Sequence, residues 1–213
     1  MRGGFDTMMV PSSLRPDLAL ISTLIDEDIR LLDVGCGDGQ LLEYLAKAKN
    51  VDGRGVELSQ SGVNASVKRG LAVIQGDADV DLCDYPDNAF DMAILSQTIQ
   101  ATRNPKAVLS ELLRIGDQVV VSFPNFGHWK VRLQLALRGR MPVTRSLNKQ
   151  WYETDNIHLC TIKDFVGLCA ELNATVEAAY SLSSGGQSRQ IRHNAIRANV
   201  LGEDAIFLIR RSE

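Results

Sequence analysis

The sequence contains no run of 18 consecutive apolar residues, and its first 17 residues, MRGGFDTMMVPSSLRPD, include no unbroken apolar core. A helix that crosses a membrane needs about 20 mainly apolar residues, so no membrane span is predicted. A secretory signal peptide requires a continuous apolar segment near the N-terminus, and none is present at this position. We therefore expect a cytoplasmic protein that does not associate with membranes.

Patterns of metal-binding and disulfide-forming residues are also missing. The four cysteines, Cys36, Cys83, Cys160 and Cys169, form no CxxC pair, and the three histidines form no HxxxH or HExxH motif. Structural zinc sites and disulfide frameworks depend on such spacings. The sequence therefore predicts no metal site, and the cysteine usage is typical of a reducing cytoplasm.

The chain has no excess of positive charge, because 23 Lys and Arg face 26 Asp and Glu, for a net charge of -3. Nucleic-acid-binding domains usually carry a clear basic excess, so no nucleic-acid partner is expected. The 213 residues, 45% of them hydrophobic, suffice for one well-cored domain and are too few for two ordinary ones. We predict a single domain over residues 1–213, with 1–13 as a flexible lead-in.

From residue 29 onward, short apolar runs alternate with helix-like segments. Such alternation predicts an α/β fold, a doubly wound, mostly parallel sheet with helices on both faces. Runs such as DMAIL and VVVS are apolar throughout, as expected of strands covered on both sides. A short helix is also expected from 14 to 25. The predicted strands are 29–35, 51–58, 71–80, 89–97, 118–125, 175–182 and 203–211, and the predicted helices 41–49, 59–70, 105–115 and 161–172.

The segment LLDVGCGDGQLLEYL, residues 31–45, places Gly35, Gly37 and Gly39 between a predicted strand and a predicted helix. Glycine allows a sharp turn and the close approach of a ligand to the backbone, and a helix N-terminus attracts anionic groups. The third glycine would stand at position 40 in a dinucleotide-binding GxGxxG motif, where this chain has Gln40. A tight turn without any ligand remains the alternative explanation.

Three acidic residues accompany this loop. Glu57 ends the second predicted strand, which lies beside the first in a doubly wound sheet, so its carboxylate can accept both hydroxyls of a ribose or remain solvated. Asp77 follows the third strand and can form a turn, or it or the following backbone can bond an adenine edge. Asp33 lies inside an apolar strand and needs a partner, either a ligand ammonium group or the N–H groups of the loop.

The stretches LLDVGCGDG, GVELS, GDAD and FDMAILSQTIQ resemble the four ligand-facing motifs of class I S-adenosylmethionine-dependent methyltransferases. The resemblance implies a Rossmann-like sheet of seven strands, the last antiparallel, and S-adenosylmethionine or S-adenosylhomocysteine as cofactor. It also implies the contacts: the methionine end near Asp33, Gly35, Gly37 and Gly39, the ribose at Glu57 and Leu58, the adenine at Asp77 and Ala78, and the sulfonium near Ser96 and Gln97.

A more specific resemblance covers residues 30 to about 172. The stretches LSQTIQATRNP, VSFPNFGHWKVRLQLALRGRMPVT and QWYETDNIHLCTIKDF are similar to those of the MetW family of bacterial methionine-biosynthesis proteins. The resemblance implies a partner of homoserine O-acyltransferase that is needed for its activity. Two functions remain open: a regulatory S-adenosylmethionine-binding protein that docks on the acyltransferase through 122–160, or an active methyltransferase on a small carboxylate-bearing metabolite.

Residues 127–160 form an insertion that we expect over the cofactor crevice. His128 and His158 are the candidate general bases there, although each can equally serve packing. Between His128 and Gln150 the chain has six Lys and Arg and no Asp or Glu. This basic stretch is either a solvated helix face, a docking surface for an acidic partner, or a rim that attracts a carboxylate or phosphate substrate. Its periodicity does not decide between helix and strand over 129–140.

Overall fold

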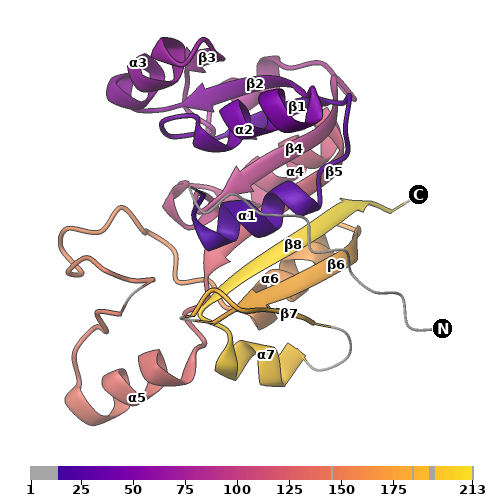
Figure 1. The fold of residues 1–213 in the computed structure, drawn as a ribbon. Helices are drawn as coiled ribbons and strands as arrows, with labels where there is room; N and C mark the ends of the chain where they lie inside the picture. Colours follow the sequence, from indigo (N-terminus) through magenta and orange to yellow (C-terminus); the bar gives the residue numbers. More distant parts are fainter. Residues whose placement is uncertain (1–13, 145, 184, 192–194, 213) are drawn as a thin grey trace.

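The computed structural model describes residues 14–144, 146–183, 185–191 and 195–212. The predicted lead-in 1–13 lies outside them. The described residues form one eight-stranded sheet with helices on both faces (Figure 1). The strands are β1 Arg30–Val34, β2 Asp52–Glu57, β3 Ala72–Gln75, β4 Phe90–Ser96, β5 Gly116–Pro124, β6 Ala174–Leu182, β7 Ser188–Gln190 and β8 Asp204–Arg211, and the α-helices are α1 Pro16–Thr23, α2 Gln40–Lys49, α3 Gln60–Lys68, α4 Pro105–Ile115, α5 Trp129–Arg138, α6 Ile162–Glu171 and α7 Ala195–Leu201.

The strand order is β3-β2-β1-β4-β5-β8-β6-β7. Strands β1 to β5 pair in parallel, and β8 is inserted antiparallel between β5 and β6. The doubly wound, mostly parallel arrangement with an antiparallel last strand is therefore confirmed. The sheet has eight strands rather than seven because β7, a strand of three residues that was not predicted, pairs with β6.

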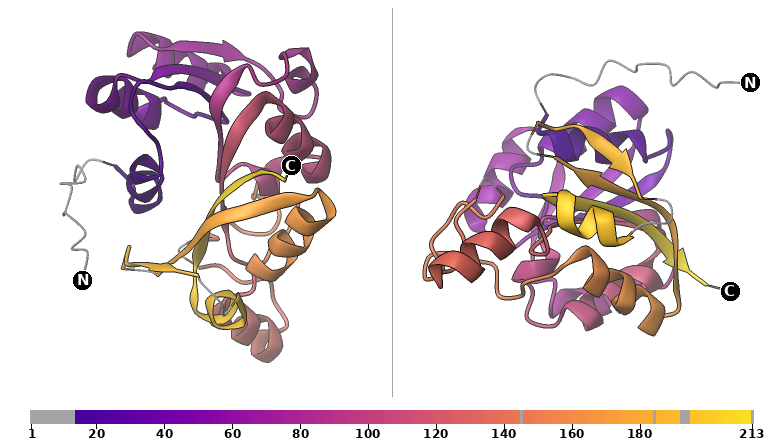
Figure 2. Two further views of the ribbon diagram at one scale, coloured as in Figure 1. Left: turned by 90° about the vertical axis from the view of Figure 1, so that its right-hand side faces the viewer. Right: turned by 90° about the horizontal axis from the view of Figure 1, so that it is seen from below.

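Helices cover both faces of the sheet (Figure 2). Neighbouring residues of one strand face opposite hydrophobic cores. Leu31 packs with α1, α2 and α3, whereas Leu32 packs with α4 and α6. This alternation follows from the two-residue period of a strand. It explains why the central strands are apolar throughout their length.

Several helix boundaries follow from local sequence. The Ser59 hydroxyl accepts a hydrogen bond from the Gly62 amide and begins α3, and Pro105 occupies the first turn of α4, as N-cap and N1 preferences predict. The segment 129–140, whose periodicity did not decide between helix and strand, forms the helix α5 over Trp129–Arg138. Helix α7 was not predicted. It begins directly after residues 192–194, which lie outside the described part of the chain.

The insertion 127–160 is anchored at its start by the side chain of Asn125, just after β5. This side chain is 2% exposed. Its Nδ2 donates to the carbonyl oxygens of Asn199 (2.9 Å) and Gly202 (2.8 Å), and its Oδ1 accepts from the amides of Gly127 (3.0 Å) and Ile162 (3.3 Å). One buried amide thus joins the end of β5 to α6 and α7, and holds the start of the insertion.

We predict that Asn125→Ala lowers the free energy of unfolding by about 3 kcal/mol, because buried donors and acceptors lose their partners. Equilibrium urea denaturation measures this. Asn64→Ala, at an exposed position of α3, is the matched control and should change stability by less than about 0.5 kcal/mol. Equal effects of the two substitutions would contradict the anchoring role.

Candidate functional site

Two adjoining cavities lie at the carboxyl ends of the parallel strands. The β2–β3 cavity, of about 240 Å³, is bounded by the residues after β2 and β3, and the glycine-loop cavity, of about 330 Å³, lies between residues 35–41 and the start of α1. Both are lined by Gly35, Gln97 and Thr98. Carboxyl ends of strands are the usual place for ligands in open α/β sheets.

The three glycines of the loop have different roles, although each has a positive φ of 60° to 79°. A Cβ atom on Gly35 would overlap the side chain of Thr98, and one on Gly39 would overlap Leu71, whereas one on Gly37 would meet nothing within 4 Å. Gly35 and Gly39 are thus required by packing within the protein. Gly37 borders open space in the glycine-loop cavity, where a ligand can approach the backbone.

Glu57 links the loop to the end of β2. Its Oε2 accepts the Gly37 amide (3.0 Å) and its Oε1 accepts the Ser59 amide (2.9 Å). A carboxylate oxygen has two lone pairs, so each oxygen retains capacity for a further donor, such as one hydroxyl of a vicinal diol. Glu57 and the 65% exposed Leu58 both line the β2–β3 cavity.

Asp33 is 2% exposed, and its Oδ1 has no hydrogen-bond partner. Burial, and to a lesser extent the charge of Glu57, raise the pKa of this carboxyl to about 7, while Arg15 acts in the opposite direction. The residue lines the glycine-loop cavity. An unpaired buried carboxyl oxygen beside a cavity is a suitable partner for a cationic hydrogen-bond donor.

At the end of β3 the backbone, rather than the carboxylate, has free hydrogen-bonding capacity. The Asp77 carboxylate accepts a hydrogen bond from the Asp79 amide (2.9 Å) and forms an ion pair with Arg103. The backbone amide of Asp77 donates to the Asp81 carboxylate (2.7 Å). The next residue, Ala78, also lines the β2–β3 cavity, and its amide donates to no residue in the described part of the chain. The Ala78 N–H is therefore available to a ligand.

Residues after β4 lie between the two cavities. The Ser96 hydroxyl bonds the Ser122 hydroxyl (3.0 Å), and Gln97 has a positive φ of 52°. Among the lining residues that sequence reasoning missed are Thr98 and Arg15. Thr98 lies within the stretch FDMAILSQTIQ, directly after Ser96 and Gln97, and carries no signal of its own. Arg15 lies far from the glycine loop in sequence, and only the packing of α1 brings it there.

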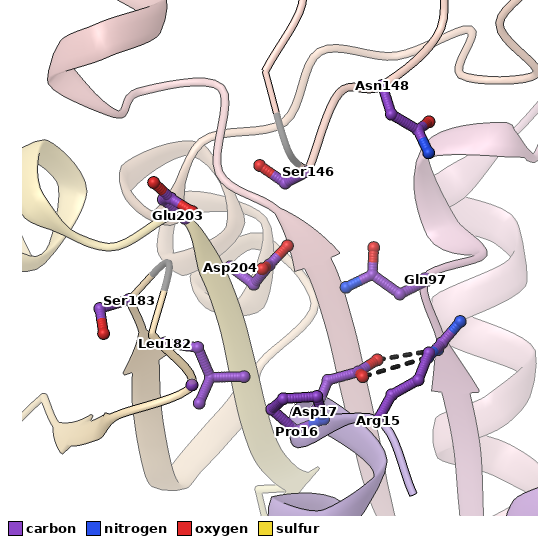
Figure 3. A pocket seen from close by; sticks show the side chains of 11 residues that line it. Arg15, Pro16, Asp17, Gln97, Ser146, Asn148, Leu182, Ser183, Glu203 and Asp204 are labelled. Atoms are coloured by element: carbon purple, nitrogen blue, oxygen red, sulfur yellow. Dashed lines mark hydrogen bonds and ion pairs between the residues drawn. The ribbon is translucent and has the colours of Figure 1, made fainter.

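Gln97 also lines two cavities on its other side. In one, of about 380 Å³, the carboxylates of Asp17, Glu203 and Asp204 lie around it (Figure 3). Burial, with Asp17 and Glu203, raises the pKa of Asp204 to about 6. The other, of about 670 Å³, is walled largely by residues 141–159. The insertion thus lines these two cavities, and none of its residues lines the two at the glycine loop.

The two candidate bases lie outside all four cavities. His128 is 5% exposed at the start of α5, and burial lowers its pKa. His158 is exposed, with Nε2 at 3.4 Å from the Arg103 carbonyl oxygen. Among the described residues, no group of three or more His, Cys, Asp or Glu is arranged to hold a metal ion, and no helix is long and apolar enough to cross a membrane.

Several solved structures similar to this chain are described as S-adenosylmethionine-dependent methyltransferases. One from Thermotoga maritima, described as a possible histamine N-methyltransferase, has a TM-score of 0.68 at 16% identity, covering 92% of this chain and 88% of its own. One from Mesorhizobium loti has a TM-score of 0.68 at 14% identity, covering 92% and 98%. At these identities the similarity establishes the fold, which is that of the class I methyltransferases.

Curated sequences give a closer relation. The bifunctional methionine biosynthesis protein MetXA/MetW of Rhodopirellula baltica is 34% identical over 179 residues, 79% of this chain. The ajmaline N-methyltransferase of Rauvolfia serpentina is 24% identical over 157 residues, 68% of this chain. This chain spans only 29% and 52% of the lengths of these two relatives. The family model of the methionine biosynthesis protein MetW matches residues 15–209, and the chain therefore belongs to the MetW family.

Proposed function

We propose that this protein binds S-adenosylmethionine, or its product S-adenosylhomocysteine, in the two adjoining cavities and acts as a regulatory, activating partner of a homoserine O-acyltransferase. The observation that carries the cofactor assignment is the unpaired Oδ1 of buried Asp33 in the wall of the glycine-loop cavity. A buried acidic group is costly without a partner. The α-ammonium group of the cofactor supplies one.

The other polar groups along the two cavities fit the remaining parts of the cofactor. The Ala78 amide is free to bond an adenine edge, and Glu57 retains capacity for the ribose hydroxyls. Gly37 leaves space for the methionine portion, and Gln97 lies between the two cavities, near the sulfonium in this assignment. The cofactor supplies an electrophilic methyl group, and these residues bind and orient it.

The partner assignment draws on the family. The Rhodopirellula relative unites a MetXA part and a MetW part in one chain, which supports physical association within this pathway. The family resemblance implies that the associated enzyme is a homoserine O-acyltransferase. In this proposal the partner's activity responds to the cofactor. Such coupling between two sites requires that the cofactor make different contacts in the two states of the complex.

The surface proposed to dock lies in 122–160. Large apolar side chains are exposed there, including Leu137 (75%), Trp151 (69%) and Tyr152 (67%). In sequence, Arg138 and Arg140 lie between Leu137 and Trp151, and neither forms an ion pair with any residue that the structure describes. Exposed apolar clusters mixed with arginine are typical of protein interfaces. This combination favours an apolar partner surface with an acidic rim.

We expect Glu57→Ala to weaken S-adenosylmethionine binding by roughly 1.5–3 kcal/mol, because a charge-assisted contact to the ribose is lost. Isothermal titration calorimetry measures the affinity. Glu171→Ala removes a carboxylate of α6 that is ion-paired with Lys106 and lines neither cavity, and it should leave affinity unchanged. Wild-type affinity in the Glu57 variant would refute the ribose assignment.

Cofactor affinity should rise with pH between about 6 and 7. The free carboxyl of Asp33 has a pKa raised to about 7, so it is mostly protonated at the lower pH, whereas an ammonium ligand requires the carboxylate. The deprotonated fraction, and with it affinity, should increase about fivefold over this unit. Titrations at both pH values, in buffers of different ionisation enthalpy, report affinity and proton release. In Asp33→Asn this part of the pH dependence should disappear, and an unaltered profile would exclude Asp33.

The partnership is tested by purifying this chain with the homoserine O-acyltransferase of the same organism and assaying the acyltransferase with and without it. We expect a complex and a higher rate in its presence. The double substitution Leu137→Gln with Trp151→Ala should weaken the complex by more than tenfold, since exposed aromatic and aliphatic anchors dominate interface energy. Val67→Gln, at an exposed position of α3, should not.

Absence of a complex together with an unchanged acyltransferase rate would refute the partnership. If the same preparation then transferred a labelled methyl group from the cofactor to a small carboxylate-bearing metabolite, the methyltransferase alternative would replace it. The cofactor assignment would stand in that case, because both functions use the same two cavities.

A further inference from the structure

Arg15, the residue before α1, lies where three cavities meet. It lines the glycine-loop cavity and both cavities on the other side of Gln97. Among the described residues that line the glycine-loop cavity, it is the only lysine or arginine. The start of α1 thus brings one positive charge to the wall of the glycine-loop cavity. The same cavity is lined by Asp33, whose Oδ1 has no partner.

The guanidinium of Arg15 is oriented and still has free donors. Its Nε and Nη2 donate to the two carboxylate oxygens of Asp17 at 3.2 and 2.8 Å (Figure 3). A guanidinium has five N–H donors, so three remain, and the side chain is 58% exposed. Asp17 therefore fixes the plane of the group, while its Nη1 side remains open to a ligand.

The charges around the cavity form a complementary pair. Asp38 is engaged by Arg69 at 3.1 Å, so Asp33 and Arg15 are the groups available to a ligand. Arg15 lowers the pKa of Asp33 against the effect of burial, which shows that the two side chains are within electrostatic range of each other. One acidic and one cationic group facing one cavity match the ammonium and carboxylate groups of an α-amino acid.

Backbone amides of the glycine loop offer little competition for a carboxylate, because most of them already donate within the protein. The acceptors are the Val56 oxygen for Gly35 and Cys36, Glu57 for Gly37, the Cys36 oxygen for Gly39 and the Asp38 side chain for Gln40. In this loop only the Asp38 amide has no partner among the described residues. A single amide does not provide the paired donors that a carboxylate prefers.

We propose that Arg15 binds the α-carboxylate of the cofactor's methionine portion and thereby selects ligands with an intact amino-acid end. The inference rests on the proposed cofactor site and names the residue that determines its specificity. Asp17 acts as a positioning residue, because it holds the guanidinium without touching the ligand itself.

The test compares S-adenosylmethionine with its decarboxylated form, which keeps the sulfonium and the amine and lacks only the carboxylate. We expect wild-type protein to bind the intact cofactor roughly tenfold more tightly, as for one charge-assisted contact at a partly exposed group. Arg15→Gln should lose that preference: affinity for the intact cofactor falls about tenfold, and affinity for the decarboxylated form stays within twofold. Such a double difference isolates the contact from indirect effects.

Arg54→Gln is the matched control. Arg54 is also ion-paired with an aspartate two residues away, Asp52, and its side chain is 53% exposed, but it lies on β2 and lines neither cofactor cavity. It should keep both affinities. Arg15→Lys should retain part of the preference, and thermal unfolding without ligand verifies that each variant is folded.

Equal weakening of both ligands by Arg15→Gln, or no change for either, overturns the role of Arg15 while leaving the cofactor site in place. Wild-type protein that binds neither ligand overturns the cofactor proposal and this inference together. The two failures are distinguishable by the titration of wild-type protein with S-adenosylmethionine, which shows binding in the first case and none in the second.

Discussion

The hydrogen bond from the Gly37 amide to the Glu57 carboxylate is the contact on which the proposed cofactor site depends. It joins the loop after β1 to the end of β2 at 3.0 Å, and a side chain on Gly62, at the start of α3, would overlap both Glu57 and the Gly37 carbonyl oxygen. Loop, strand end and helix start are therefore fixed together before any ligand arrives. A preorganised site of this kind loses little conformational freedom on binding.

Gln97 connects the two cavities proposed for the cofactor to the part of the molecule that includes the insertion, because it lines both of them and also the two cavities lined by insertion residues. Its amide is held by the Ser122 carbonyl (2.9 Å), and its own carbonyl accepts Nε2 of Gln100 (2.7 Å). The Gln100 carbonyl in turn accepts the amides of Ile157 and His158 at 2.8 and 2.9 Å. The turn after β4 thus contacts both the two cavities proposed for the cofactor and the irregular part of the insertion. A ligand that shifts Gln97 has a short, hydrogen-bonded route to residues 141–159.

Much of this was predictable from sequence because it is local. A glycine loop between strand and helix, an acid at the next strand end and capped helices each depend on a few neighbouring residues, and the parallel order then brings Gly35 beside Val56. The partner of Asp77 was not predictable, since Arg103 lies 26 residues away. The position of Arg15 in the wall of the glycine-loop cavity was not predictable for the same reason. Residue type made His128 and His158 candidate bases, but both lie outside the cavities, His128 buried at the start of α5 and His158 exposed.

Binding the cofactor does not by itself decide between regulation and methyl transfer, because a fold does not determine function. Methyl transfer from a sulfonium needs chiefly a positioned acceptor, so the absence of a histidine from the cavity walls described here does not argue against it. The deciding part of the molecule is the segment after β5. Its residues line the cavity of about 670 Å³ and also present Leu137, Trp151 and Tyr152 to solvent. A partner that covers this surface would contact the same loop that walls the cavity beside Gln97, so docking and occupation of that cavity are physically connected whichever chemistry the protein performs.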